Sequence, residues 1–310
     1  MPLSCWPGRC VSVPIGLSLY LTEEHAQQLN VPYQSRSALA REIVDFVATQ
    51  LPTRPVRVLG AGGYATKDYL QKLPATVPVV GRMLSTGKLY APPPPRRSCR
   101  GCPPKKGPLL GSPKTLARRR RGWQPHPTEA GALVQAWPGL WPTVLPGRVL
   151  RVVVVRRPTS LRSRSPRRRK PRPPVEAFFP TDLTLRVQAL LAQYRDRWAV
   201  EITIRDSNAF TGFGQDQCRK HERVVGANPL RLLLAAARTL WFVAQTSQTG
   251  PCDFQLSRPW YRQKCAPSQL DLVWACREAL QEAGVFPIPR FPPALAINQQ
   301  KPAIALPWAA

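Results

Sequence analysis

One side of a helical stretch carries four polar residues, namely Tyr194, Arg197, Glu201 and Asn208. At 100° per residue these four fall within an arc of about 60° around the helix axis. Apolar side chains border the same arc, so Glu201 is predicted to lie on the buried side of its helix. A buried carboxylate is costly unless it pairs with a cation or binds a metal ion.

Both roles are open to Glu201 from spacing alone. Arg197 and Arg205 lie four residues before and after it, which favours a ladder of ion pairs along the helix. A carboxylate is also a ligand that Mg²⁺ prefers. The residues therefore predict either an ion-pair ladder or one ligand of a metal site.

The spacing Tyr-(2)-Arg-(3)-Glu at 194–201 resembles the Tyr-(2)-Arg-(3)-Glu-(6)-Lys signature of a large group of insertion-sequence transposases. The flanking segments are similar too: "FFPTD" comes before the helix, and "RDSNAFTGFGQDQCRK" and an apolar helix follow it. The resemblance covers roughly residues 11–285. It implies an RNase H-like fold in which two aspartates and one glutamate hold two Mg²⁺ ions for DNA strand cleavage and transfer.

The resemblance also implies a role for each residue of the stripe. Glu201 corresponds to the third acid and metal ligand, and Arg197 to a residue that positions this glutamate or a phosphate. Tyr194 corresponds to a contact with the DNA backbone. Asn208 stands where the signature has lysine, so it offers a hydrogen bond to DNA but no charge. The implied partner is DNA, at the element ends and at the target.

Two of the three acids are missing. The second acid is expected after the strand in "VRVLGAGGYA", where this chain has Ala61, and the nearest acid, Asp68, is about two helical turns away. The chain has no acid before Glu23, so we expect it to begin after the strand that carries the first acid. This predicts a truncated copy that binds DNA, does not hold Mg²⁺ productively and does not cut.

Apolar periodicity predicts an α/β fold. Residues 11–21 alternate like a strand, and residues 35–50 form a helix for which Ser37 is the expected N-cap. Residues 181–208 form one long helix pattern. The segment "NPLRLLLAAARTLWFVAQ" is expected to be a buried helix, and a last helix runs from its cap at Ser268 to Gly284.

The fold class expected is an RNase H-like mixed sheet flanked by helices, interrupted by a β-rich basic insertion and followed by a helical C-terminal part. The resemblance and the shifts in composition predict four parts: the first part of the RNase H-like domain at 1–91, the insertion at 92–175, the second part of that domain at 176–250, and a helical extension at 251–310.

The formal net charge is +28 and the isoelectric point is near 11, which indicates a polyanionic partner. Nucleic acid is the first candidate and an anionic membrane surface the second. No apolar run reaches the roughly 18 residues of a spanning helix. Two basic runs are candidate phosphate contacts: Arg118, Arg119, Arg120 and Arg121, then Arg167, Arg168, Arg169 and Lys170. Such runs also fit an RNA-binding tail, the non-enzymatic alternative.

Two further motifs compete with these interpretations. The segment "VLGAGGYA" fits the dinucleotide-binding fingerprint but lacks the acid expected about 20 residues later. Cys99 and Cys102 form a C-x-x-C pair near His126, without the second pair that a zinc site usually needs. We expect a cytoplasmic, nucleoid-associated bacterial protein with mostly reduced cysteines, and a homodimer is compatible with the resemblance.

Overall fold

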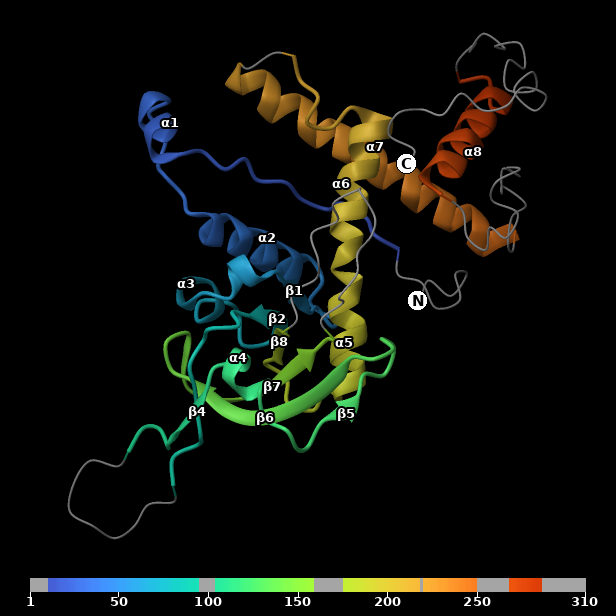
Figure 1. The fold of residues 1–310 in the computed structure, drawn as a ribbon. Helices are drawn as coiled ribbons and strands as arrows, with labels where there is room; N and C mark the ends of the chain where they lie inside the picture. The colour runs from blue at the N-terminus through green and yellow to red at the C-terminus, as the bar shows by residue number, and fades with distance from the viewer. Residues whose placement is uncertain (1–10, 95–103, 159–174, 218–219, 250–267, 286–310) are drawn as a thin grey trace, which may run out of the picture.

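The computed structural model describes residues 11–94, 104–158, 175–217, 220–249 and 268–285. These residues form one eight-stranded sheet with helices on both faces and a helical layer beyond one end (Figure 1). The strands are β1 (Val58–Gly60), β2 (Val79–Met83), β3 (Leu89–Tyr90), β4 (Leu109–Gly111), β5 (Gln124–Pro125), β6 (Leu133–Trp141), β7 (Leu145–Arg156) and β8 (Val175–Pro180).

The strand order is β1-β2-β8-β7-β6-β3-β4, and β5 pairs with β6 away from this path. β1 and β2 are parallel, and the other pairs are antiparallel. The mixed α/β class predicted from the sequence is thereby confirmed. The strands of residues 92–175 join the same sheet as β1 and β2, with β6 and β7 between β8 and β3, so they form no separate layer.

The helices are α1 (Glu23–Gln28), α2 (Arg36–Gln50), the 3-10 helix η1 (Gly62–Tyr64), α3 (Lys67–Leu70), α4 (Pro113–Leu116), α5 (Val187–Asp196), α6 (Trp198–Thr211), α7 (His221–Thr249) and α8 (Gln269–Glu282). The sequence predicted the strand, glycine turn and short helix at β1, η1 and α3. It also predicted α8, where Ser268 forms the expected cap in a capping box with Asp271.

Side chains alternate across the sheet, so the two faces bury separate cores. Val152 and Val154 of β7 point to the face that α3 and α4 cover, where Leu116 and Tyr69 are buried. Val153 and Val155 point to the opposite face, where α5 packs through Leu190 and Leu191. The sheet thus holds α5, and with it Tyr194, in a fixed place.

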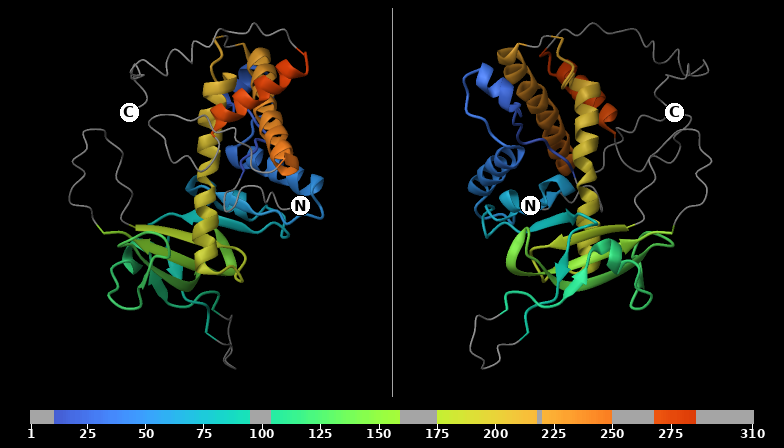
Figure 2. Two further views of the ribbon diagram at one scale, coloured as in Figure 1. Left: turned by 90° about the vertical axis from the view of Figure 1, so that its right-hand side faces the viewer. Right: turned by 60° about the vertical axis from the view of Figure 1, so that its left-hand side comes forward.

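The helix predicted over 181–208 is present from Val187 onward as α5 and α6, which meet at Arg197. It starts late because the Asp182 carboxylate accepts hydrogen bonds from the backbone N–H and the hydroxyl of Thr184, which fixes a turn instead. The two helices form one rod, of which only the α5 end lies against the sheet. α6 extends past it toward α7 and α8 (Figure 2).

Three predictions of local structure are wrong. Residues 11–21 form no strand, because no strand lies beside them to pair with, and side chains such as Ile15 face solvent. The cap of α2 is Ser35, whose hydroxyl accepts from the N–H of Ala38, and not Ser37. The apolar helix α7 is buried on one side only, since Leu230 and Leu233 are 66% and 63% exposed.

Candidate functional site

The carboxyl ends of β1, β2 and β7 meet the start of β8 at one edge of the sheet, beside the last turn of α5. A cluster of charged side chains lies there on the face that α5 covers. Glu176 of β8 is its centre: Oε1 accepts from Arg82 at 3.0 Å, and Oε2 accepts from Arg157. The Glu176 side chain is 13% exposed, so two cations neutralise a largely buried carboxylate.

Arg157 links this pair to a second acid. Its Nε donates to Oε1 of Glu129 at 2.6 Å, so it is shared between Glu129 and Glu176. Burial alone would lower the pKa of Arg157, but the hydrogen bonds to the two carboxylates raise it above its ordinary value. The cluster is therefore an ion-pair network that keeps each of its charges matched.

Tyr194 lies against this network as part of the core. Its ring packs on Phe178 with centroids 4.5 Å apart, and the Arg197 guanidinium stands 5.7 Å from its centroid. Burial raises the pKa of the Tyr194 hydroxyl. The ring therefore fixes α5 to the sheet, and its DNA-backbone contact stays a prediction.

Glu201 does not lie on the buried side of its helix, which corrects the prediction from periodicity. Its side chain is 42% exposed, because α6 has by then run beyond the sheet that would cover it. The carboxylate accepts from Nη2 of Arg197 at 2.8 Å, so this half of the predicted ladder is present. Arg205 pairs with Asp206 instead. Within the described residues, the buried Nε of Arg197 has no hydrogen-bond partner.

Ala61 follows β1 directly and begins the η1 turn. The register that pairs Gly60 with Gly81 places Ala61 beside Arg82, at the edge of the ion-pair network. Asp68 turns away, toward Lys72 at 2.6 Å and Arg41 at 3.6 Å. Among the residues that the structure describes, no group of three or more His, Cys, Asp or Glu side chains is arranged to hold a metal ion.

Asn208 lies two turns beyond Glu201 on the same side of α6. Its backbone carbonyl accepts from Nε2 of Gln215 at 3.0 Å, which joins it to the turn after α6. The structure thus brings Tyr194, Arg197 and Glu201 together and leaves Asn208 further along the rod.

The arginine run at 118–121 leaves α4 as an exposed loop. Trp123 anchors it by donating from Nε1 to the carbonyl of Arg119 at 2.7 Å. Arg156 stacks on the Trp123 ring at 4.7 Å and donates to the carbonyl of Ala117. Across the described part of the chain, none of these four guanidinium groups has a carboxylate within 4.0 Å. The second run, 167–170, lies outside the described residues.

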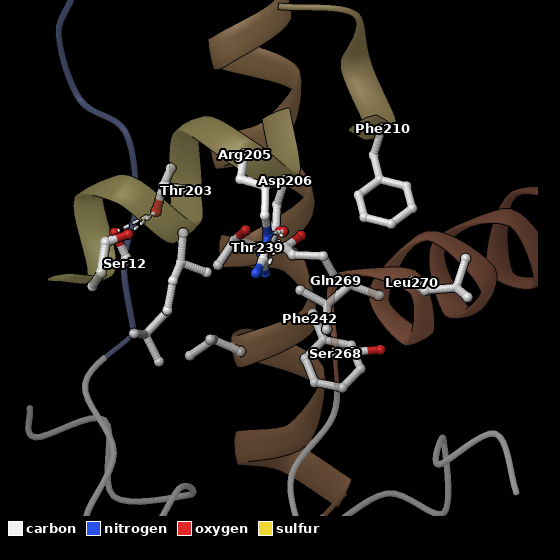
Figure 3. A pocket seen from close by; sticks show the side chains of 15 residues that line it. Ser12, Thr203, Arg205, Asp206, Phe210, Thr239, Phe242, Ser268, Gln269 and Leu270 are labelled. Atoms are coloured by element: carbon white, nitrogen blue, oxygen red, sulfur yellow. Dashed lines mark hydrogen bonds and ion pairs between the residues drawn. The ribbon is translucent and has the colours of Figure 1, made fainter. Parts of the chain in front are cut away.

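A cavity of about 400 Å³ opens between α6, α7, α8 and the segment that starts at Val11. Thr203 and Asp206 of α6 and Phe242 of α7 line it, and Thr203 is hydrogen-bonded to Ser12 at 2.6 Å (Figure 3). Thr203 lies about 160° around α6 from Glu201. The cavity therefore lies mainly on the side of the rod away from the Tyr194–Arg197–Glu201 stripe, and only Arg205, one turn beyond Glu201, joins the two within the lining.

The described structure gives no support to the dinucleotide-binding fingerprint or to a zinc site near His126. "GAGGYA" forms a 3-10 turn before the four-residue α3, so no long helix begins where a pyrophosphate would bind. The Nδ1 atom of His126 accepts from the N–H groups of Thr128 and Glu129, and Cys99 and Cys102 lie outside the described residues. No helix in the described ranges has both the length and the apolar character needed to cross a bilayer.

Comparison with protein-family models and with curated proteins gave no match to this chain.

The sequence-based prediction missed the centre of the charged cluster. Glu176 lies in "VEAFFP", where alternation places it on the same face as Phe178. That pattern was readable, but the partners of Glu176 come from β2 and from the end of β7. Only the sheet order brings Arg82 and Arg157 to either side of it.

Proposed function

We propose that the chain is a DNA-binding protein of the insertion-sequence transposase type with an incomplete metal site. The Tyr194–Arg197–Glu201 resemblance supports this class, and so does a mixed sheet that carries the corresponding helix on one face. We also propose that this mixed α/β fold is of the RNase H-like type.

The observation that carries DNA binding is the exposed loop at 118–121. None of the four adjacent guanidinium groups has a carboxylate partner in the described structure, although Nη2 of Arg119 donates to the carbonyl of Leu110 at 3.4 Å, so they offer donors to phosphates. Trp123 and Arg156 hold the base of this loop, which lowers the entropy lost when it binds. Each phosphate contact releases counterions, so binding should weaken steeply with salt.

The residues present do not fit a Mg²⁺ site of the DDE type. Ala61 brings no oxygen ligand to the position of the second acid. Glu201 is engaged by Arg197, and Glu176, at the centre of the ion-pair network, is neutralised by two arginines. We therefore propose binding without strand cleavage.

The test of DNA binding compares the full chain with a variant in which residues 118–121 are all glutamine. The slope of log affinity against log salt should become shallower by about 3 to 4 units, at roughly 0.9 per phosphate contact. The matched control changes four exposed cations elsewhere to glutamine: Arg54, Lys67, Lys88 and Lys220. If the salt slope changed equally in both variants, binding would depend only on net charge, and the loop at 118–121 would not be the DNA-binding site.

The same labelled duplex, incubated with Mg²⁺ or Mn²⁺, tests the second half of the proposal. We expect no cleavage products. Cutting that Glu201→Ala abolishes would mean that the metal site is complete. Competition with duplex DNA and with RNA of equal charge distinguishes the partners, because preferential displacement by RNA would contradict the transposase-type assignment.

A further inference from the structure

Arg238 of α7 is a buried cation without a carboxylate partner in the described structure. The residue is 8% exposed, and its Nη2 donates to Oε1 of Gln269 on α8 at 3.1 Å. Its Nε is buried and has no hydrogen-bond partner among the described residues. No described carboxylate lies within 4.0 Å of this guanidinium. A guanidinium has five N–H donors, and the bond to Gln269 uses one of them.

The acid that comes nearest to serving Arg238 is already paired with another arginine. Asp206 of α6 binds Arg205 at 2.8 Å and lies beyond ion-pair distance from Arg238. Burial lowers the pKa of Arg238 below its ordinary value, and attraction to Cys276 and Asp206 offsets this only in part. Two cations thus share one carboxylate here. Because a buried charge is costly unless it is paired, the site favours the entry of one more negative group.

Arg238 lies at the edge of the cavity between α6, α7 and α8. It lines a recess of about 10 Å³ that adjoins this cavity of about 400 Å³. The two share five wall residues, which are Ser12, Thr203, Asp206, Thr239 and Gln269 (Figure 3). A space of this size holds about one water molecule. The recess therefore admits one carboxylate oxygen and is too small for the tetrahedral head of a phosphate.

The rest of the cavity is suited to an apolar group. Phe242 and Val243 of α7, Leu272 of α8 and Phe210 of α6 line it. At about 30 Å³ for each water-sized group, its volume takes roughly 13 non-hydrogen atoms. Small-molecule pockets with mostly apolar walls and a few placed polar groups have volumes in this range. A nucleic-acid strand is too large to enter it.

We propose that this cavity binds an apolar monocarboxylate of about a dozen non-hydrogen atoms. One carboxylate oxygen accepts a hydrogen bond from Arg238, and the apolar part lies against Phe242 and Val243. The ion pair is charge-assisted and is strengthened by surroundings that exclude water. The apolar part gains from burial. Binding therefore needs both the charge and the apolar chain, and the proposal does not depend on the proposed function.

The test is isothermal titration calorimetry of the full chain, free of nucleic acid, with decanoate below its micelle-forming concentration. Decanoate has ten carbons and two oxygens, which match the volume of the cavity. We expect one decanoate to bind per chain. Decanol has the same chain without the charge and should bind roughly tenfold more weakly or worse, because a hydrogen bond between charged groups is lost. Inorganic phosphate should not displace decanoate. Equal affinity for decanol, displacement by phosphate or the absence of saturation at one ligand per chain would overturn the proposal.

Two matched variants locate the charge that matters. Arg238→Met should weaken decanoate binding by roughly tenfold or more and leave decanol binding unchanged. Arg223→Met removes the same charge from an exposed position of the same helix and should bind decanoate like the wild type. Equal weakening in both variants would mean that decanoate responds to net charge, and the Arg238 site would be wrong.

A third variant and a stability measurement separate the cavity from other sites. Ala199→Phe narrows the cavity from the α6 side and should weaken the binding of both ligands. Unchanged binding would place the ligands elsewhere and contradict the proposal. Without ligand, the thermal midpoint of Arg238→Met should be no lower than that of the wild type, because the change removes an unpaired buried cation. A lower midpoint would mean that Arg238 already has an anionic partner within the chain, and this too would overturn the proposal.

Discussion

Arg197 donates from Nη2 to Oε1 of Glu201 across 2.8 Å, one helical turn away on the same side of the rod. The acid that the sequence singled out is thus held by its own helix. Arg197 is the more buried partner, with a side chain 23% exposed against 42% for Glu201. The pair therefore holds the carboxylate against its own helix while leaving it exposed.

Replacing Glu201 by glutamine should change stability little. An exposed i,i+4 ion pair contributes about 0.3–0.5 kcal/mol, so Glu201→Gln should lower the free energy of unfolding by no more than about 0.5 kcal/mol. Urea unfolding followed by circular dichroism measures this. A loss of several times that size would contradict the exposed position of the carboxylate.

Replacing Glu176 by glutamine should be more damaging. The change leaves Arg82 and Arg157 with one fewer negative partner at a site where the acid is only 13% exposed. Hydrogen bonds to charged groups are each worth about 1.5–3 kcal/mol, so a loss of about 2 kcal/mol or more is expected. Glu129→Gln, at a side chain 30% exposed, serves as the milder comparison. Equal effects of the two changes would argue against Glu176 as the centre of the network.

Gly81 of β2 leaves room for the ring of Phe179, its partner on the neighbouring strand β8. A Cβ atom at Gly81 would stand 2.7 Å from Cζ of Phe179, whose ring is fully buried and packs edge-on against Trp141. Overpacking a core usually costs about 1–3 kcal/mol, and we expect Gly81→Ala to lose stability in that range. Gly63→Ala is the control, since nothing lies within 4 Å of its added methyl. Comparable thermal midpoints for the two variants would refute the close packing.

Tyr69 should make the fold sensitive to high pH. Burial, with smaller contributions from Tyr64 and Asp45, raises the pKa of Tyr69 to about 12 from an ordinary value of 10.0. Above pH 10 the unfolded chain loses this proton while the folded chain keeps it. Stability is therefore complete below pH 10 and falls between about pH 10 and 12, by on the order of 2 kcal/mol.

Tyr69→Phe removes this titration and leaves the ring in place. Unfolding measured at several pH values should show a flatter decline for the variant than for the wild type in the same window. Parallel curves for the two proteins would mean that the Tyr69 hydroxyl keeps its ordinary pKa in the folded state.

Local patterns were sufficient where neighbours in sequence decide the structure. The strand, turn and helix around Ala61 and the capped start of α8 depend on residues a few positions apart, and both were predicted. The exposure of Glu201 was not, because it depends on where the sheet ends beneath the rod. Periodicity gives the angle of a side chain around its helix, but it does not tell whether another element of the fold covers that side chain. The same reason explains why α7 was predicted to be a buried helix although one of its sides is exposed.

The polar network escaped prediction for a related reason. Arg82 and Glu176 come from β2 and β8 and Arg157 directly follows β7, and each is unremarkable within its own segment. Their meeting depends on β8 lying between β2 and β7, an order that alternation alone does not specify. Long-range strand order was thus the missing information for the candidate site as well as for the fold.

The place of β8 in the sheet has a consequence for how the chain folds during synthesis. The N–H of Val79, at the start of β2, bonds the hydroxyl of Thr181, 102 residues later, and β2 has no other antiparallel neighbour among the described strands. At roughly 5–20 residues per second, a ribosome needs about 5–20 s to supply that partner. Over this interval β2 can pair only with β1 and its other edge stays open, and the valine run of β7 emerges before the strand that covers its second edge. We expect nascent chains to depend on chaperones in this window.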